Sequence, residues 1–277
     1  MSVTRNEFEY VRSLIRQRAG IVLEEGKEYL VESRLSPLAE QEGCNSLGEY
    51  LGRMQRDTFN RSHRKLIHAM TTNETLFFRD IRPFELLRSR IVPDLIAARE
   101  NQRCLTFWSA ACSTGQEPYT IAMILREYFP QLLGWNLRII ASDLSPDVLA
   151  RAVCGRYSQL EVNRGLPVKF LVKYFSRDRD NWQIHEEIRR MVEFREMNLA
   201  EEWSFLPKID VVFLRNVLIY LNRETKGKIL SNVASRLPPD GYLFLGSAET
   251  TLNLAEEFEP LPAITTGCYR VKQAKLP

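Results

Sequence analysis

The sequence of 277 residues predicts an α/β protein with a doubly wound, mostly parallel sheet. Two observations carry the prediction. Apolar strand-like runs alternate with helical patterns from Leu105 onward, which is typical of strands joined by crossover helices. The preceding segment shows only helical spacing, so a small all-α domain is expected there. We place the helical domain at 1–70, a linker with a lead-in helix at 71–100, and the α/β domain at 101–277, with a small β-subdomain inserted at 155–190.

The first 70 residues contain apolar positions spaced three and four apart, as in Phe8, Val11, Leu14 and Ile15. Such stripes are more often core than partner grooves, so several short helices packed on one another are expected. The linker that follows is polar at Asn73, Thr75 and Arg79, with two phenylalanines between them. It is either a capped linker whose phenylalanines pack inward or a lid over a ligand pocket.

The stretch from Leu105 to Leu125 organises the α/β domain. Leu105–Trp108 suits a buried strand, and the small residues of Ser109–Gly115 then allow a tight turn close to a ligand. Pro118 fits the first turn of the next helix, where its missing N–H costs nothing. Strand, small-residue turn and helix open many nucleotide-binding units, although the G-x-G-x-x-G form is absent and the signal alone is weak.

A second apolar run, Leu137–Ala141, ends at Asp143, which lies 26 residues after Glu117. Ser145 is a candidate N-cap, with Pro146 at the first helical position. An acid at the tip of this strand is placed to accept hydrogen bonds from ribose hydroxyls. The alternative is that Asp143 only caps its own loop, and ribose binding is the favoured interpretation.

Further elements follow the same alternation. We expect helices at Pro83–Ala98 and Lys226–Leu237, and strands at Val192–Met197, Asp210–Leu214 and Tyr242–Leu245, with Cys268–Val271 as an edge strand. The insertion is expected to hold a helix near Pro167–Tyr174 and a hairpin around Trp182. Polar residues end four of the strands: Ser109–Glu117, Asp143, Asn198-Leu199 and Arg215-Asn216. Because ligands of such sheets bind beyond the carboxyl ends of the strands, these residues predict one shared site.

Composition excludes several function classes. The formal net charge is only +3 with both signs interleaved, so a nucleic-acid footprint is not expected. No apolar run reaches the roughly 18–20 residues of a membrane span, and the N-terminus lacks the apolar core of a signal peptide. Five scattered cysteines fit reduced thiols in a cytoplasm, and the three histidines make no metal-ligand spacing with them. No metal site is expected.

Several motifs together resemble the CheR family of chemotaxis receptor methyltransferases, which are S-adenosylmethionine-dependent protein-glutamate O-methyltransferases. The matching segments run in order along nearly the whole chain: Gln17–Leu23, Thr71–Arg79, Trp108–Tyr119, Ala141–Asp143, Arg215–Tyr220 and Gly241–Ser247. The resemblance implies a helical N-terminal domain, a linker and a Rossmann-like methyltransferase domain with a β-subdomain at 155–190.

Carried over by position, the resemblance implies that S-adenosylmethionine is the cofactor and S-adenosylhomocysteine the product. The implied cofactor contacts are Asn73, Thr75, Arg79, Glu117, Asp143, Asn198, Leu199, Arg215 and Asn216, with Asp143 at the ribose. Arg79 and Tyr220 would stand nearest the reacting groups. An ionised glutamate needs no general base, which agrees with motifs that contain no histidine and no metal ligand. Nucleic-acid amine methyltransferases typically have Asn/Asp-Pro-Pro-Tyr/Phe where this chain has Arg215-Asn216-Val217.

The resemblance further implies a monomer that acts on the cytoplasmic helical region of chemoreceptors. In the best-known members the second helix of the N-terminal domain is strongly basic, whereas here only Arg34 is in place and Ser36–Gln41 carries no positive charge. We therefore expect weaker docking by that helix. The stretch between Phe175 and Val192 is short, so we do not expect the β-subdomain to bind a receptor C-terminal pentapeptide.

Two other functions stay open at this stage. One is a small-molecule carboxyl or hydroxyl methyltransferase of the same fold, and the other is a non-catalytic receptor-binding module. The presence together of Asn73, Arg79, Asp143 and Tyr220 argues against the module. Cys112 is not expected to be a nucleophile, because no histidine in any motif is there to activate it.

Overall fold

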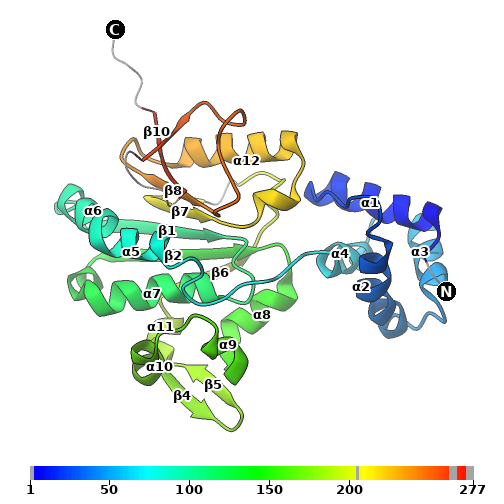
Figure 1. The fold of residues 1–277 in the computed structure, drawn as a ribbon, viewed down its shortest axis with the longest axis horizontal. Coiled ribbons are helices and arrows are strands. Elements are labelled where there is room, and N and C mark those ends of the chain that lie inside the picture. The colour runs from blue at the N-terminus through cyan, green and yellow to red at the C-terminus, as the bar shows by residue number, and fades with distance from the viewer. Residues whose placement is uncertain (1–2, 204–205, 262–266, 273–277) are drawn as a thin grey trace. The chain divides into compact units, whose positions relative to one another are not determined.

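The computed structural model describes residues 3–203, 206–261 and 267–272 (Figure 1). By its contacts the chain forms two compact units. The first comprises Met1–Thr72 together with two short later segments, Asn198–Glu201 and Tyr220–Lys226. The second comprises Asn73–Met197, Glu202–Ile219 and Gly227–Pro277. In the described part of the chain, no helix has the length and apolar character that crossing a membrane requires.

Four amphipathic helices build the first unit: α1 (Arg5–Ala19), α2 (Glu28–Gln41), α3 (Leu47–Arg56) and α4 (Arg61–Ala69). The helical spacing of Phe8, Val11 and Ile15 places these side chains in its core, as predicted. Thr4 begins α1 with a capping box to Glu7. The guanidinium of Arg34 donates to the Met70 carbonyl at 2.7 Å, so this arginine fastens α2 to the end of α4.

The two later segments complete the first unit. Gly20 ends α1 at a φ of +69°, and an added Cβ there would lie 2.6 Å from Thr225 Cγ2, so only glycine fits without a shift. Ile21 then forms an antiparallel bridge with Leu221. Asn198 donates from its side-chain amide to the Arg18 carbonyl at 2.8 Å.

The second unit contains the predicted sheet, with strand order β6-β2-β1-β7-β8-β10-β9. The strands are β1 (Cys104–Ala110), β2 (Asn136–Asp143), β6 (Val192–Glu196), β7 (Val211–Leu214), β8 (Tyr242–Leu245), β9 (Phe258–Pro260) and β10 (Cys268–Val271). The first five in spatial order run parallel, and β10 pairs antiparallel with both β8 and β9. All four residues of β7 and of β8 are buried, as expected of strands covered on both faces.

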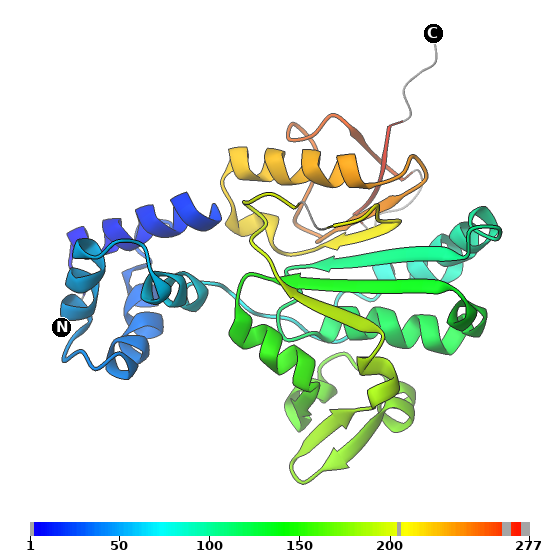
Figure 2. The same cartoon turned by 180° about the vertical axis from the view of Figure 1, so that it is seen from behind.

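Helices cover both faces of this sheet. In the view of Figure 1, α12 (Arg223–Arg236) lies above the strands and α7 (Gln116–Tyr128) below them, and Figure 2 shows the same from behind. The helix α8 (Pro146–Cys154) follows β2. A short 3-10 helix, η2 (Pro130–Gly134), leads from α7 into β2. The doubly wound, mostly parallel fold predicted from the sequence is confirmed.

The lead-in helix contains an irregularity that the pattern did not reveal. The expected Pro83–Ala98 helix is α5 (Arg82–Leu86), a π-helical turn η1 (Leu87–Ile91) and α6 (Val92–Ala98). In the π turn, the N–H of Val92 bonds to the carbonyl of Leu87. Pro93 follows immediately and has no N–H to donate, which favours a break in the regular ladder at this point.

The insertion holds the expected helix and hairpin. These are α10 (Val168–Tyr174) and the pair β4 (Phe175–Asp178) and β5 (Asn181–Ile184). The structure adds β3 (Arg156–Ser158), α9 (Gln159–Asn163) and α11 (Glu186–Arg189), and the three strands pair in the order β3-β5-β4. The strand β3 has three residues, too few to show an alternating pattern in the sequence.

One expectation is wrong. Cys268–Val271 is not the edge strand, because Phe258–Pro260 pairs with its outer side and forms the edge as β9. Pro260 in that strand suits an edge, where a missing N–H is tolerated. Ser145 does stand at the N-cap of α8, as expected, although its side chain makes no capping bond and its own N–H donates to Asp143.

Candidate functional site

The candidate site lies where β1 and β7 meet at the carboxyl edge of the sheet. These strands are neighbours, yet the chain leaves β1 toward β2 on one side and later returns to β7 on the other. Such a reversal of strand order opens a crevice beyond the strand ends, which is the usual ligand position in an open α/β sheet.

The loop after β1 is wound into an unusual backbone. Ala111, Ser113 and Gly115 have φ values of +55°, +50° and +91°, a left-handed conformation that residues other than glycine rarely adopt. An added Cβ on Gly115 would lie 3.0 Å from the Cβ of Ala152 in α8. Glycine at 115 therefore permits both its own turn and the close approach of this helix.

Asp143 ties this loop to β2. One carboxylate oxygen accepts the N–H of Ser113 at 2.8 Å, and the other accepts the N–H of Ser145 at 3.0 Å. The residue is buried, with 6% of its surface exposed. Asp143 thus does cap its own loop, the alternative that the sequence left open.

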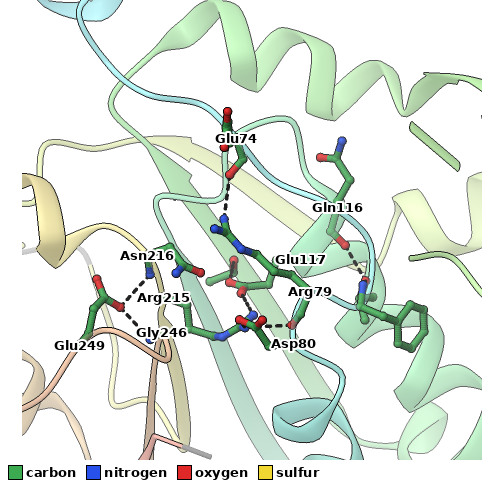
Figure 3. A network of polar contacts seen from close by, with 12 residues as sticks. Glu74, Arg79, Asp80, Gln116, Glu117, Arg215, Asn216, Gly246 and Glu249 are labelled. Carbon is green, nitrogen blue, oxygen red and sulfur yellow. Dashed lines mark hydrogen bonds and ion pairs between the residues drawn. The ribbon is translucent and has the colours of Figure 1, made fainter. Parts of the chain in front are cut away.

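Arg215 lies at the centre of an ion-pair network at the end of β7 (Figure 3). Its guanidinium donates to Glu117 Oε2 at 2.9 Å, to Asp80 Oδ2 at 2.9 Å and to the Arg79 carbonyl at 2.9 Å. Glu117 also accepts the hydroxyl of Ser109 at 2.8 Å. Only 1% of the Arg215 side chain is exposed, so the protein itself satisfies this charge.

Arg79 contrasts with this neighbour. Its guanidinium donates to the backbone carbonyl of Glu74 at 3.0 Å, and within the described residues no carboxylate forms an ion pair with it. The residues on either side, Phe78 and Asp80, have φ values of +52° and +55°. Left-handed backbone at non-glycine residues often marks a functional site, and here it flanks a half-buried cation.

The linker is anchored rather than loose along this edge. Phe77 and Phe78 are buried, and Phe77 packs edge-on against Tyr157 at a centroid distance of 5.0 Å. The carbonyl of Asn73 accepts the hydroxyl of Ser113 at 2.8 Å, which holds the linker against the loop after β1. The inward packing of the phenylalanines is confirmed. Asn73 is exposed and Thr75 half-buried, and their proposed cofactor contacts stay predictions.

The structure brings seven of the predicted residues into one unit: Asn73, Thr75, Arg79, Glu117, Asp143, Arg215 and Asn216. Asn198, Leu199 and Tyr220 group with the helical unit instead. There the amide of Asn198 bonds to Arg18 and Glu201, and the carbonyl of Tyr220 accepts the N–H of Val22 at 2.8 Å. Their roles at the cofactor stay predictions.

Cys112 is fully buried in the loop after β1. Burial raises the pKa of its thiol well above the usual range, and the nearby carboxylates of Asp143 and Glu117 raise the pKa further. A thiol with a raised pKa is a poor nucleophile. This agrees with the expectation that Cys112 is not a nucleophile.

Sequence reasoning missed two side chains. Asp80 completes the network of Arg215 and Glu117, and Glu249 binds the loop after β7. Glu249 also lines a pocket of about 580 Å³ with Asp80 and Arg215. A signal for Glu249 did exist, because it stands three residues beyond Gly246, directly after the buried strand β8.

Together the fold and these side chains define a nucleotide-cofactor-binding α/β protein. The left-handed loop after β1, the acid ending β2 and the crevice at the strand reversal suit an adenosyl group with a ribose diol. Comparison with known families gives the class more closely. The model of the CheR methyltransferase SAM-binding domain matches residues 73–266, and that of the CheR methyltransferase all-alpha domain matches residues 6–71.

Curated relatives agree over nearly the full length. The chain is 43% identical to chemotaxis protein methyltransferase 1 of Pseudomonas aeruginosa, over 98% of this chain and 100% of that protein. It is 41% identical to chemotaxis protein methyltransferase Cher2 of Pseudomonas putida with the same coverage, and 37% identical to a Vibrio anguillarum relative over 98% and 99%. The chain belongs to the CheR family of chemotaxis methyltransferases, and its cofactor is S-adenosylmethionine.

Proposed function

We propose that this protein transfers a methyl group from S-adenosylmethionine to glutamate side-chain carboxylates of chemoreceptors, forming glutamyl methyl esters. The observation that supports it is the contrast between two neighbouring arginines. Arg215 forms ion pairs with Glu117 and Asp80, whereas Arg79 has no carboxylate partner among the described residues. A half-buried guanidinium at a cofactor crevice is suited to hold an incoming carboxylate by charge-assisted hydrogen bonds.

The remaining predicted residues have parts in holding the cofactor. We assign the ribose hydroxyls to Asp143, an acid at the carboxyl end of β2, and the approach of the adenosyl group to the loop of Ala111–Gly115. We assign Asn73, Thr75, Glu117 and Arg215-Asn216 to the linker side and methionine end, and Asn198-Leu199 to the adenine, on the strength of the family match.

Methyl transfer to a carboxylate requires from the protein mainly that it position the two reacting groups. When bound, the cofactor supplies a methyl group activated by its sulfonium. A carboxylate oxygen oriented by Arg79 would accept that methyl group, and the electron pair of the broken carbon–sulfur bond would stay on sulfur. No proton moves, because glutamate is already ionised at neutral pH. The tasks left are in-line positioning and exclusion of water, which we assign to Arg79 and Tyr220.

The partner we propose is the cytoplasmic helical region of a chemoreceptor, reached from the cytoplasm by a monomer. The curated relatives are named chemotaxis protein methyltransferases, which supports a substrate in a chemotaxis pathway. In α2, the guanidinium of Arg34 donates to the Met70 carbonyl and the Thr72 hydroxyl. This side chain is therefore already used in contacts within the helical unit. Weak docking by α2 stays a prediction, as does the absence of pentapeptide binding by the β-subdomain.

The test follows labelled methyl groups. The purified protein is incubated with S-adenosyl-[methyl-³H]methionine and membranes that carry a chemoreceptor from the same genome. Receptor-bound label that base releases as volatile methanol is expected, since methyl esters are base-labile. Receptors with glutamine at the methylated positions should take up no label.

Other outcomes contradict the proposal in distinct ways. Label in a small-molecule fraction would favour the small-molecule methyltransferase. Base-stable label on protein would exclude a carboxyl acceptor. Failure of S-adenosylhomocysteine to bind in isothermal titration calorimetry would leave the non-catalytic module.

A further inference from the structure

The loop that follows β7 is held by a single carboxylate. Glu249 accepts four backbone N–H groups: its Oε2 takes those of Asn216 and Gly246, each at 2.7 Å, and its Oε1 takes those of Val217 at 2.9 Å and Ile219 at 3.3 Å. Figure 3 shows Glu249 reaching toward Asn216 and Gly246, on the side of Arg215 away from Glu117. Three of these donors belong to the loop itself, so Glu249 fixes its path.

The loop has a shape that needs such support. Asn216 has a φ of +58°, a left-handed conformation that costs a non-glycine residue free energy. Its N–H and those of Val217 and Ile219 converge on one side, forming a concave set of donors that favours an anion. Only 9% of the Glu249 surface is exposed, so water does not readily replace the carboxylate.

Gly246 makes the approach possible. An added Cβ would lie 2.7 Å from Asn216 Nδ2, 2.8 Å from Glu249 Oε2 and 2.9 Å from the Asn216 nitrogen. Its φ is not in the left-handed region, so alanine would be excluded here by contact and not by backbone strain. The turn from Gly246 to Glu249 and the loop after β7 therefore fit each other as a pair.

We infer that Glu249 is a positioning residue for methyl transfer and that Gly246 is required for its action. Glu249 touches neither the cofactor nor the acceptor in this assignment. It holds the backbone between Arg215-Asn216, assigned to the methionine end, and Tyr220, assigned to the reacting groups. The inference rests on the proposed function for its effect on turnover, whereas its effect on the loop stands independently.

The first test is hydrogen–deuterium exchange with mass spectrometry on Glu249→Gln. An amide puts one NH₂ group against backbone N–H donors, so two of the four lose their acceptor. Exchange in a peptide covering 215–220 should accelerate at least tenfold, with peptides elsewhere unchanged. The matched control is Glu256→Gln, an exposed glutamate in the same stretch of chain.

The second test is steady-state kinetics on the same variants at a temperature where circular dichroism shows them folded. Glu249→Gln should lower kcat at least tenfold and change KM for S-adenosylmethionine less than threefold. Gly246→Ala should do likewise, whereas Gly134→Ala, where nothing lies within 4 Å of the added Cβ, should match the wild type.

Chemical rescue separates positioning from a general loss of stability. Glu249→Ala removes the carboxylate beside a pocket of about 580 Å³, through which a small anion can enter. Sodium formate should restore at least part of the lost kcat, and sodium chloride at equal ionic strength should not.

Three results would overturn the inference: unchanged exchange at 215–220, faster exchange with kcat within twofold of the wild type, or rescue by chloride equal to that by formate. If the wild-type protein transferred no methyl group to the receptor, the proposed function would be contradicted instead. The exchange experiment would still decide whether Glu249 holds the loop.

Discussion

The two ends of β7 carry similar ion-pair triads that differ in their surroundings. Before the strand, Arg99 lies between Asp210 at 3.1 Å and Asp240 at 2.7 Å. After it, Arg215 lies between Glu117 and Asp80, each at 2.9 Å. Five of the eight non-glycine residues with positive φ in the described chain belong to the linker and loops around Arg215: Phe78, Asp80, Ala111, Ser113 and Asn216. The same electrostatic arrangement thus fastens a regular edge at one end and an irregular, site-forming edge at the other.

The largest expected effect is at Arg79, the arginine at this edge that belongs to neither triad. Arg79→Ala should lower kcat about 100- to 1,000-fold, the usual cost of removing one donor to a reacting oxygen. The urea midpoint should stay near that of the wild type, because Arg79 makes only a carbonyl bond. Arg79→Lys should be intermediate, since the charge remains and the planar fork is lost. Equal kcat in all three proteins would remove Arg79 from the reaction.

A second experiment sets the two triads against each other. Arg215→Met leaves two carboxylates without their buried cation and should cost about 3–5 kcal/mol in the free energy of unfolding. It should also weaken S-adenosylhomocysteine binding, because the loop after β7 moves with it. Arg99→Met should cost about 1–3 kcal/mol, because the Arg99 side chain is 13% exposed and that of Arg215 only 1%, and it should leave cofactor binding unchanged. Urea unfolding and calorimetric titration measure the two effects, and equal losses of binding would contradict the contrast.

Asp143 offers a smaller effect at the site-forming edge. Asp143→Ala should weaken binding of S-adenosylhomocysteine by about ten- to a hundredfold, as expected from about 1.5–3 kcal/mol for a hydrogen bond to a charged group. Part of that loss comes through the Ser113 N–H, which the carboxylate now holds. Isothermal titration measures it, with Asp210→Asn at the other edge as the control. Unchanged affinity for Asp143→Ala would exclude the residue from the site.

The smallest effect is a pH dependence at the regular edge. The hydrogen bond from Arg99 holds the pKa of Asp240 below its usual range, while burial raises the pKa of Asp210. A lowered folded-state pKa means that the stabilisation by Asp240 is present above about pH 4 and is lost as the pH falls through the folded value. Asp240→Asn should therefore be less stable than the wild type at pH 7, by about 0.5–1 kcal/mol for a partly exposed pair, and equal to it near pH 2. Urea midpoints that differ equally at both pH values would contradict this assignment.

Local patterns predicted the elements well where burial alone decides them. The run Tyr242–Leu245 is the strand β8 to the residue, because a short apolar stretch between Gly241 and Gly246 has little freedom to shift. The order of strands across the sheet was harder. Phe258–Pro260 is too short to show a pattern, so the sequence predicts Cys268–Val271 as the edge strand, a position that β9 occupies.

The sequence predicted which residues belong to the site better than it predicted which of them form ion pairs and hydrogen bonds with one another. Asp143 and Arg215 were found from their places at strand ends. The sequence could not show that Arg215 is satisfied by Asp80 while Arg79 is not, because the choice depends on left-handed turns at Phe78 and Asp80. Three of the four bonds of Glu249 were equally hidden, since they join residues some thirty positions apart in the chain.

The composition of the helical unit has a consequence for how its gene segment can recombine with others. Its fold includes the segments Asn198–Glu201 and Tyr220–Lys226, which lie in the chain between segments of the other unit. A chain cut at residue 72 would separate the Arg18 carbonyl from the amide of Asn198, and the Val22 N–H from the Tyr220 carbonyl. The amino-terminal helices are therefore poor candidates for exchange between unrelated genes, because a foreign helical domain would have to bring matching partners for both segments.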